Sequence, residues 1–223
     1  GVLIAVEGAT AEETAEQAGR LCAALREQGH VVIEPGDGER DQARWAAATR
    51  EANLSGARAK ALAVAAVRAD LVERVIRPAL AEGFVVVVDR FLASPLAQFG
   101  VAAGTVLDPG ELESLAAWAT GRLRPDITVL LDRAPAAVDP AEPVERRGLV
   151  GEEHIRVQRL LTRMAAAEPH RYVVVDAEGS PEVVAARVLT GLAPVCPPPT
   201  VRAPDATFRE QATVVDPDAR APR

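Results

Sequence analysis

The sequence predicts an α/β fold in which about five parallel strands are flanked by helices on both faces. Short apolar segments alternate along the chain with longer segments of helical periodicity, which is typical of strand–helix–strand units with right-handed crossovers. Residues 84–88 (FVVVV) are five consecutive apolar residues, the sign of a strand buried on both faces of a parallel sheet. A chain of 223 residues, 48% of them hydrophobic, has the size of one such domain.

The first half of the chain begins with an apolar run that ends at Glu7-Gly8. Apolar residues at helical spacing follow until Gly29, a residue that commonly terminates helices. A second apolar run is broken by Pro35-Gly36, and an Ala-rich stretch follows it. We therefore predict strands over residues 2–6, 31–33 and 84–88, and helices over residues 14–28, 40–52 and 57–81.

The second half repeats the alternation. Asp108 supplies an N-cap and Pro109 a first-turn proline for a helix that reaches Ala119. The further elements predicted are strands over residues 127–131 and 172–175, and helices over residues 152–167 and 181–192. From Ala193 onward Pro, Ala, Asp and Arg dominate without periodicity. We therefore expect one domain over residues 1–192 and a disordered linker or tail over residues 193–223.

Composition excludes several classes of function. A net charge of −7 and a pI near 5.1 argue against nucleic-acid binding, which needs a basic surface. Cys22 and Cys196 form no metal-binding or redox spacing. Both look like reduced thiols, so we expect a cytoplasmic protein. No membrane span or signal peptide is apparent. Because the chain begins with Gly1, we expect it to be a piece of a longer polypeptide with other domains.

The segment after the first strand is the first candidate site, because ligands bind beyond the carboxyl ends of strands in open parallel sheets. A phosphate-binding loop at this place needs glycines, whose backbone N–H groups surround the phosphate, and a lysine that neutralises it. Gly8, Thr10 and Thr14 are its loop-like residues here. Lys60 is the only lysine of the chain, and it lies in a predicted helix.

Glu12, Glu13 and Glu16 put carboxylates where phosphates would sit. A carboxylate about 5 Å from a phosphate charge costs on the order of 3 kcal/mol at an effective dielectric constant near 20. The helix dipole returns only ~0.3–1 kcal/mol. The segment is thus a degenerate phosphate-binding loop or, alternatively, an ordinary helix start in which acidic residues favour the first turn.

A second candidate site follows the buried strand that ends at residue 88. Asp89 and Arg90 place a carboxylate and a guanidinium at its tip, where the first is suited to a metal-bound phosphate and the second to an acceptor phosphate. The alternative is a buried ion pair that caps the strand.

Across residues 1–192 the chain resembles bacterial thymidylate kinase. Asp89-Arg90-Phe91 resembles that family's "DRY" segment, and residues 119–132 resemble its "ATGLxPDLTxLLD" stretch. His154, Arg156 and Val157 resemble its last long helix. The resemblance implies a three-layer P-loop kinase fold, commonly dimeric, that transfers the γ-phosphoryl group of ATP to dTMP with Mg²⁺.

Several family roles carry over to matching residues. Arg90 matches the arginine that contacts the dTMP phosphate, Asp89 the acid beside it, and Arg68 an arginine that reaches the nucleotide. The resemblance also implies monophosphate-binding roles for Phe91, Ser94 and Glu34. Arg146 and Arg147 are the only candidates for the arginines of the lid, with a solvated loop pair as the alternative.

Other positions depart from the family pattern. Ile33 stands where the family has the arginine of "REPG", and Val64 where an aromatic residue stacks on thymine. In the phosphate-binding loop, the family's "EGxxGxGKTTQ" is replaced by residues 7–17, EGATAEETAEQ. The loop glycines, the lysine and the Mg²⁺-binding hydroxyl are lost together, and these groups supply most of the catalysis in phosphoryl transfer.

Three functions remain open from the sequence. The first is a pseudokinase that keeps the fold as a structural, dimerising or regulatory domain and binds a nucleotide monophosphate. The second is an active dTMP kinase with atypical phosphate binding, in which Thr14 serves Mg²⁺. The third is a nucleotide-binding fold that has been repurposed for another small ligand at residues 89–100.

Overall fold

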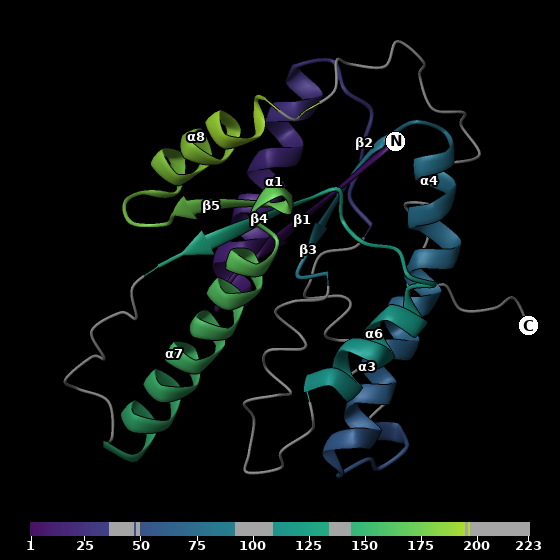
Figure 1. Ribbon diagram of the computed structural model, residues 1–223, viewed down its shortest axis with the longest axis vertical. Helices are drawn as coiled ribbons and strands as arrows, with labels where there is room; N and C mark the ends of the chain where they lie inside the picture. Colours follow the sequence, from purple (N-terminus) through teal and green to yellow (C-terminus); the bar gives the residue numbers. More distant parts are fainter. Residues whose placement is uncertain (36–46, 48–49, 92–108, 134–143, 195, 197–223) are drawn as a thin grey trace, which may run out of the picture.

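The computed structural model describes residues 1–35, 47, 50–91, 109–133, 144–194 and 196. Five strands form one parallel sheet in the order β2-β3-β1-β4-β5, which confirms the predicted fold class (Figure 1). The strands are β1 (Val2–Glu7), β2 (Val32–Ile33), β3 (Val85–Asp89), β4 (Ile127–Asp132) and β5 (Tyr172–Asp176).

Helices cover both faces of the sheet, which gives three layers (Figure 1). One face carries α1 and α8, and the other carries α7 and the helical segment that contains α3 and α4, with α6 packed on α3. The helices are α1 (Ala11–Glu27), α3 (Ala57–Leu71), α4 (Arg77–Ala81), α6 (Pro109–Ala119), α7 (Val144–Ala167) and α8 (Pro181–Leu192).

The core follows the two-residue period of the strands, as β1 illustrates. Ile4 and Val6 pack in the cluster beneath α1 and α8, whereas Leu3 and Ala5 pack in the cluster beneath the α3–α4 segment. All four side chains are fully buried. Because successive side chains of a strand point to opposite faces, a central strand that is covered on both sides has to be apolar throughout.

Two helices begin earlier than the sequence analysis predicts. Helix α1 starts at Ala11 rather than at residue 14, because its polar first turn, with Glu12 and Glu13, lacks apolar periodicity but is favoured by the helix dipole. Helix α7 starts at Val144 rather than at residue 152.

The helix predicted over residues 57–81 is interrupted. Val72–Ile76 adopts a π-helical turn between α3 and α4. Pro78 lies two residues beyond this turn, in the first turn of α4. Proline has no N–H to donate to the carbonyl four residues before it, and its ring collides with that carbonyl in a regular helix. The wider π turn accommodates both effects.

Parts of the predicted organisation lie outside the described residues. Of the helix predicted over residues 40–52, the structure describes Ala47, Arg50 and Glu51 as helical. Of the predicted tail, residue 195 and residues 197–223 lie outside the description. Among the helices that the structure describes, none combines the length and the apolar character that crossing a membrane requires.

Candidate functional site

Four acidic residues end neighbouring strands at the same edge of the sheet. Glu7 ends β1, Asp89 ends β3, Asp132 ends β4 and Asp176 ends β5. The register places Val6 opposite Asp89, so the Glu7 and Asp89 carboxylates belong to adjacent strand ends. Glu7 is 1% exposed and Asp89 is 7% exposed. This edge, together with the start of α1, is where the sequence analysis predicts ligand binding.

The turn after β3 holds Arg90 in a left-handed backbone conformation, with a φ of +52°. This conformation costs a non-glycine residue on the order of 1–3 kcal/mol and persists only where neighbours hold it. Here the Arg90 N–H donates to the carbonyl oxygen of Val6 at 2.9 Å. The Arg90 carbonyl oxygen accepts a hydrogen bond from Nη2 of Arg68 at 3.0 Å.

Arg68 also covers the residue that follows. Its Cζ lies 5.5 Å from the ring centroid of Phe91, a cation–π distance. Both side chains are buried. Helix α3 thus fixes the Asp89-Arg90-Phe91 turn through one hydrogen bond and one ring contact. The structure therefore brings together the four residues Arg68, Asp89, Arg90 and Phe91 that the sequence analysis selects.

The side chain of Arg90 retains binding capacity. It is 9% exposed, and its Nε and Nη2 atoms make no hydrogen bond to any described residue. Buried guanidinium donors are normally paired, and a two-pronged donor of this kind matches a phosphate or a carboxylate. The arrangement is therefore suited to an anion.

The carboxylate of Asp89 is similarly unpaired, since neither oxygen makes a hydrogen bond within the described part of the chain. Burial raises its pKa to about 6. The neighbouring Thr14 hydroxyl and the Arg90 guanidinium lower this pKa only in part, and Glu7 raises it further. The hydroxyl of Thr14 itself lies 3.1 Å from the carbonyl oxygens of Thr10 and Ala11, to which it donates.

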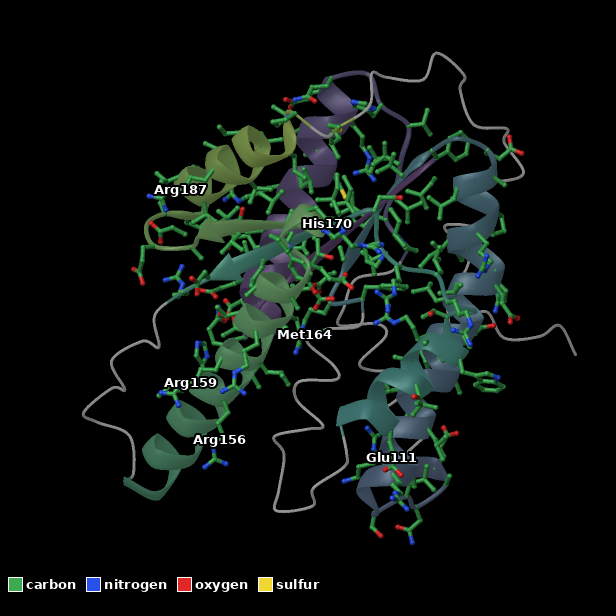
Figure 2. The ribbon with its side chains drawn as sticks, in the orientation of Figure 1. Glu111, Arg156, Arg159, Met164, His170 and Arg187 are labelled. Atoms are coloured by element: carbon green, nitrogen blue, oxygen red, sulfur yellow. The ribbon has the colours of Figure 1, made fainter. Side chains whose placement is uncertain are left out.

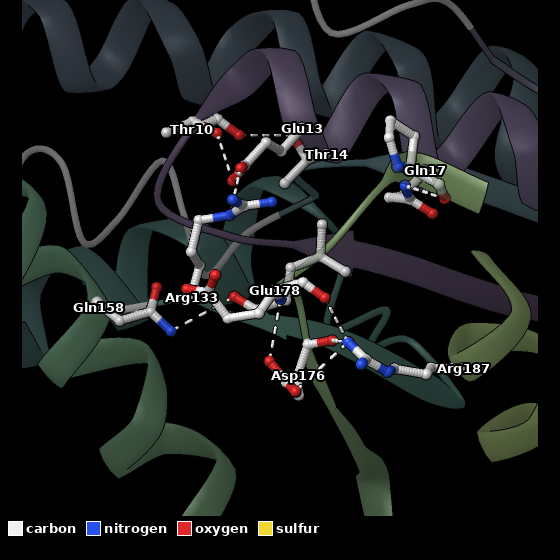
Figure 3. A network of polar contacts seen from close by, with 11 residues as sticks. Thr10, Glu13, Thr14, Gln17, Arg133, Gln158, Asp176, Glu178 and Arg187 are labelled. Atoms are coloured by element: carbon white, nitrogen blue, oxygen red, sulfur yellow. Dashed lines mark hydrogen bonds and ion pairs between the residues drawn. The ribbon is translucent and has the colours of Figure 1, made fainter. Parts of the chain in front are cut away.

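A polar network joins the start of α1 to the end of β4 (Figure 3). Thr10, the N-cap residue, has an extended backbone and donates its hydroxyl to Oε2 of Glu13 at 2.9 Å. The other oxygen of Glu13, Oε1, lies 2.5 Å from Nε of Arg133, the residue that follows β4. Sequence reasoning missed Arg133, although a cation directly after a buried strand is a signal that it offers.

The end of β4 is held from the other side by α7. The side-chain amide of Gln158 donates to Oδ1 of Asp132 at 2.8 Å and to the carbonyl oxygen of Leu131 at 3.4 Å. Gln158 is buried, whereas Asp132 is exposed, so the bond between them is only partly shielded from water. The position from which Arg133 reaches toward α1 is therefore set by both the sheet and α7.

There is no room for a side chain at Gly8. A Cβ atom at this residue would lie 2.9 Å from Cγ2 of Thr14, closer than such atoms approach in proteins. The turn between β1 and α1 consequently passes directly against the first turn of the helix.

Among the remaining predicted monophosphate-binding and lid residues, the structure describes the side chain of Glu34 alone. Glu34 is exposed and lies 3.8 Å from Arg26, with which it forms an ion pair. Ser94 lies outside the described residues. Arg146 and Arg147 fall in the first turn of α7. Further along that helix, the side chains of two other arginines, Arg156 and Arg159, are exposed (Figure 2).

The polar groups at the start of α1 are not suited to binding a triphosphate with its metal ion. The Glu13 carboxylate occupies the first turn and is already paired with a cation. The Thr14 hydroxyl donates its proton to backbone carbonyls, so it offers no hydrogen bond to a phosphate oxygen. In the part of the chain that the structure describes, no three His, Cys, Asp or Glu residues gather as metal ligands would.

Comparison with known proteins gives a consistent result. The family model described as thymidylate kinase matches residues 15–188. The chain is 41% identical to a thymidylate kinase of Clavibacter sepedonicus over 198 residues, which cover 84% of this chain and 92% of that protein. It is 39% identical to a thymidylate kinase of Cutibacterium acnes over 211 residues, covering 86% of this chain and 98% of that protein.

A solved structure shows the same fold. The crystal structure of thymidylate kinase from Ehrlichia chaffeensis superposes with a TM-score of 0.66 and covers 86% of this chain and 98% of that one. Its sequence identity to this chain is 21%, so the likeness concerns the fold alone.

Proposed function

Because the chain belongs to the thymidylate kinase family, we propose that it is a pseudokinase, a domain that keeps the fold and a monophosphate-binding group but not the phosphate-binding loop of phosphoryl transfer. The family reaction transfers a phosphoryl group from ATP to dTMP with Mg²⁺. In this chain the ATP half of that site is degenerate, whereas the dTMP half is kept in part.

One observation carries the proposal. At the start of α1, where the family binds the ATP phosphates, the chain presents the carboxylate of Glu13, paired with Arg133 and bonded to Thr10. A carboxylate near a phosphate charge costs on the order of 3 kcal/mol, which exceeds the ~0.3–1 kcal/mol that an exposed helix dipole returns. Since Lys60 is the chain's only lysine, that of the family loop has no equivalent. ATP and Mg²⁺ therefore have no fitting partners at this place.

Arg90 supports the proposal that the chain still binds a nucleotide monophosphate. Its buried Nε and Nη2 atoms lack a hydrogen bond among the described residues, and its backbone is locked by Val6 and Arg68. A preorganised guanidinium of this kind matches the phosphate of dTMP or of a related nucleotide. Phe91, Ser94 and Glu34 stay in the proposal as monophosphate-binding residues; of these, Glu34 would have to leave its ion pair with Arg26.

An active dTMP kinase is the competing function. The identity of 41% to a protein named thymidylate kinase favours it. In that case Arg133, or Arg146 and Arg147, would replace the missing lysine, and Asp89 and Arg90 would act at the phosphate. This alternative predicts turnover that is abolished by Arg90→Ala.

The biological role in our proposal is structural or regulatory. We propose that the domain acts in the cytoplasm, within a larger polypeptide or as a homodimer, and responds to a nucleotide monophosphate without consuming ATP. Neither nucleic acid nor a membrane is a partner in this proposal.

Calorimetric titration tests the proposal directly. The purified chain is titrated separately with dTMP and with Mg·ATP, and the same sample enters a coupled assay of ADP release. The Clavibacter sepedonicus relative serves as the positive control. We expect binding of dTMP, no binding of Mg·ATP and no turnover. Binding of Mg·ATP with dTMP-dependent ADP release would show that the chain is an active kinase.

A further inference from the structure

The family resemblance assigns no role to Arg133. In the structure, however, Arg133 forms an ion pair with Glu13 in the first turn of α1. We propose that the Arg133 guanidinium is an anion-binding group whose built-in occupant is the Glu13 carboxylate. In this arrangement the chain blocks its own phosphate position with an internal anion. The proposal rests on the proposed function, since it explains why the ATP half of the site is closed.

The two oxygens of Glu13 have different partners. Oε1 lies 2.5 Å from Nε of Arg133 in an ion pair that lacks hydrogen-bond geometry, and Oε2 accepts a hydrogen bond from the hydroxyl of Thr10 at 2.9 Å (Figure 3). The partners come from two elements, the end of β4 and the N-cap of α1. A phosphate at a helix N-terminus is bound by backbone N–H groups of the first turn. The Glu13 carboxylate lies beside the same turn, but it is held by side-chain partners.

The contact is among the less exposed ion pairs of the described residues. The side chains of Arg133 and Glu13 are 30% and 31% exposed, whereas those of Arg58 and Glu111 are 76% and 60% exposed. The pair of Arg20 with Glu16 is only slightly more exposed, at 35% and 42%. Arg133 is held in place because Gln158 fixes the preceding residue, Asp132. A guanidinium with five N–H donors presents more donors than a single carboxylate oxygen engages.

A specific consequence follows for external anions. With Glu13 neutral, Arg133 would be an unpaired cation at the positive end of α1, and a polyphosphate would replace the carboxylate. With Glu13 charged, the positive charge of Arg133 is already neutralised, and the carboxylate of Glu13 repels the polyphosphate. The ligand class is therefore a phosphate or polyphosphate anion, and its access is controlled by a single carboxylate.

The test uses inorganic tripolyphosphate without metal, so that base recognition and turnover play no part. Calorimetry compares the wild-type chain, Glu13→Gln, Glu13→Gln combined with Arg133→Gln, and Glu16→Gln. Glu16 is the matched control: the sequence pattern puts it near the phosphate position as well, but the structure pairs it with Arg20 at 3.0 Å and not with Arg133. Circular dichroism and thermal melting show that each variant is folded.

We expect Glu13→Gln to bind tripolyphosphate at least about tenfold more tightly than the wild type. We expect this gain to be lost in the double variant and absent in Glu16→Gln. A folded Glu13→Gln variant without any gain would overturn the proposal, as would a gain that survives Arg133→Gln or appears equally in Glu16→Gln. Mg·ATP turnover by the wild type would instead refute the proposed function, so the two failures are distinguishable.

Discussion

Nη2 of Arg68 on α3 donates a hydrogen bond to the carbonyl oxygen of Arg90, 3.0 Å away, across 22 positions of the sequence. Because Arg90 has a positive φ, this bond stabilises a backbone conformation that the residue does not adopt readily on its own. Arg68 thus acts on the candidate site through the backbone of Arg90 and through the ring of Phe91.

Replacing Arg68 with methionine is expected to lower the free energy of unfolding by about 2–5 kcal/mol. A hydrogen bond from a charged group contributes about 1.5–3 kcal/mol, and a cation–π contact about 0.5–2 kcal/mol. Urea denaturation measures the change. Arg74→Met is the control, because Arg74 forms an exposed pair with Asp70 on the neighbouring turn, and a loss under about 0.5 kcal/mol is expected there. Equal losses in the two variants would contradict the role given to Arg68.

Asp89 is expected to make stability fall as the pH rises. Burial raises its pKa from 3.8 to about 6 in the folded chain, so the folded state binds the proton more tightly than the unfolded state. The free energy of unfolding therefore declines as the pH rises from 3.8 to about 6, by at most ~3 kcal/mol. Above the folded-state pKa the full loss of stability is present.

Asp89→Asn tests this expectation, since it removes the titrating group and nearly preserves its size. We expect the variant to be about as stable as the wild type near pH 4 and more stable near pH 7, by up to ~3 kcal/mol. Urea unfolding over this pH range gives the difference. A wild-type stability that rises with pH relative to the variant would reverse the assigned sign.

Gly8→Ala is expected to destabilise the chain by about 1–3 kcal/mol, because its Cβ would lie 2.9 Å from Cγ2 of Thr14. Thr14→Ser removes that methyl group and leaves the hydroxyl. The double variant should therefore recover most of the loss caused by Gly8→Ala. Thermal melting of the wild type, the two single variants and the double variant measures this recovery. If the losses of the two single variants simply add in the double variant, the contact with Cγ2 of Thr14 is not the cause.

The Glu13–Arg133 pair is expected to contribute little to stability despite its proposed control of anion binding. Both side chains are nearly one-third exposed, and pairs of this kind are worth about 0–1 kcal/mol. A double-mutant cycle with Glu13→Gln and Arg133→Gln, followed by urea denaturation, gives the coupling energy. A coupling well above about 1 kcal/mol would make the pair a structural element of the fold.

Arg90→Gln is expected to weaken dTMP binding by at least about tenfold, because the glutamine side chain has no charge for the phosphate. Thymidine is the matched probe, since it lacks the phosphate. Calorimetry should show that the variant loses affinity for dTMP but not for thymidine. Unchanged dTMP affinity would remove Arg90 from the proposed site.

The order of the strands and helices follows from the sequence because each element has a local signal. The continuous apolar run that ends in Asp89 predicts a central strand, and the structure places β3 there between β2 and β1. Boundaries were less well predicted. The polar first turn of α1 has no apolar period, and the π turn at Val72–Ile76 depends on how Pro78 is accommodated.

The candidate site was predicted only in part. Arg68, Asp89, Arg90 and Phe91 meet as expected, since they follow or face the end of a buried strand. Glu34 carries the same kind of sequence signal, but it is exposed and pairs with Arg26. Whether a side chain turns toward a strand edge or into solvent depends on packing, and no local pattern records it.

The sequence by itself determined the family, the alternation of strands and helices, and the acidic start of α1, because these depend on residue type and spacing. Only the tertiary structure decided that the carboxylate of Glu13 meets Arg133, 120 positions away in the numbering of this chain. The physical reason is that an ion pair requires two side chains within a few ångströms of each other. That distance is set by the parallel pairing of β1 with β4, not by either residue's neighbours in sequence.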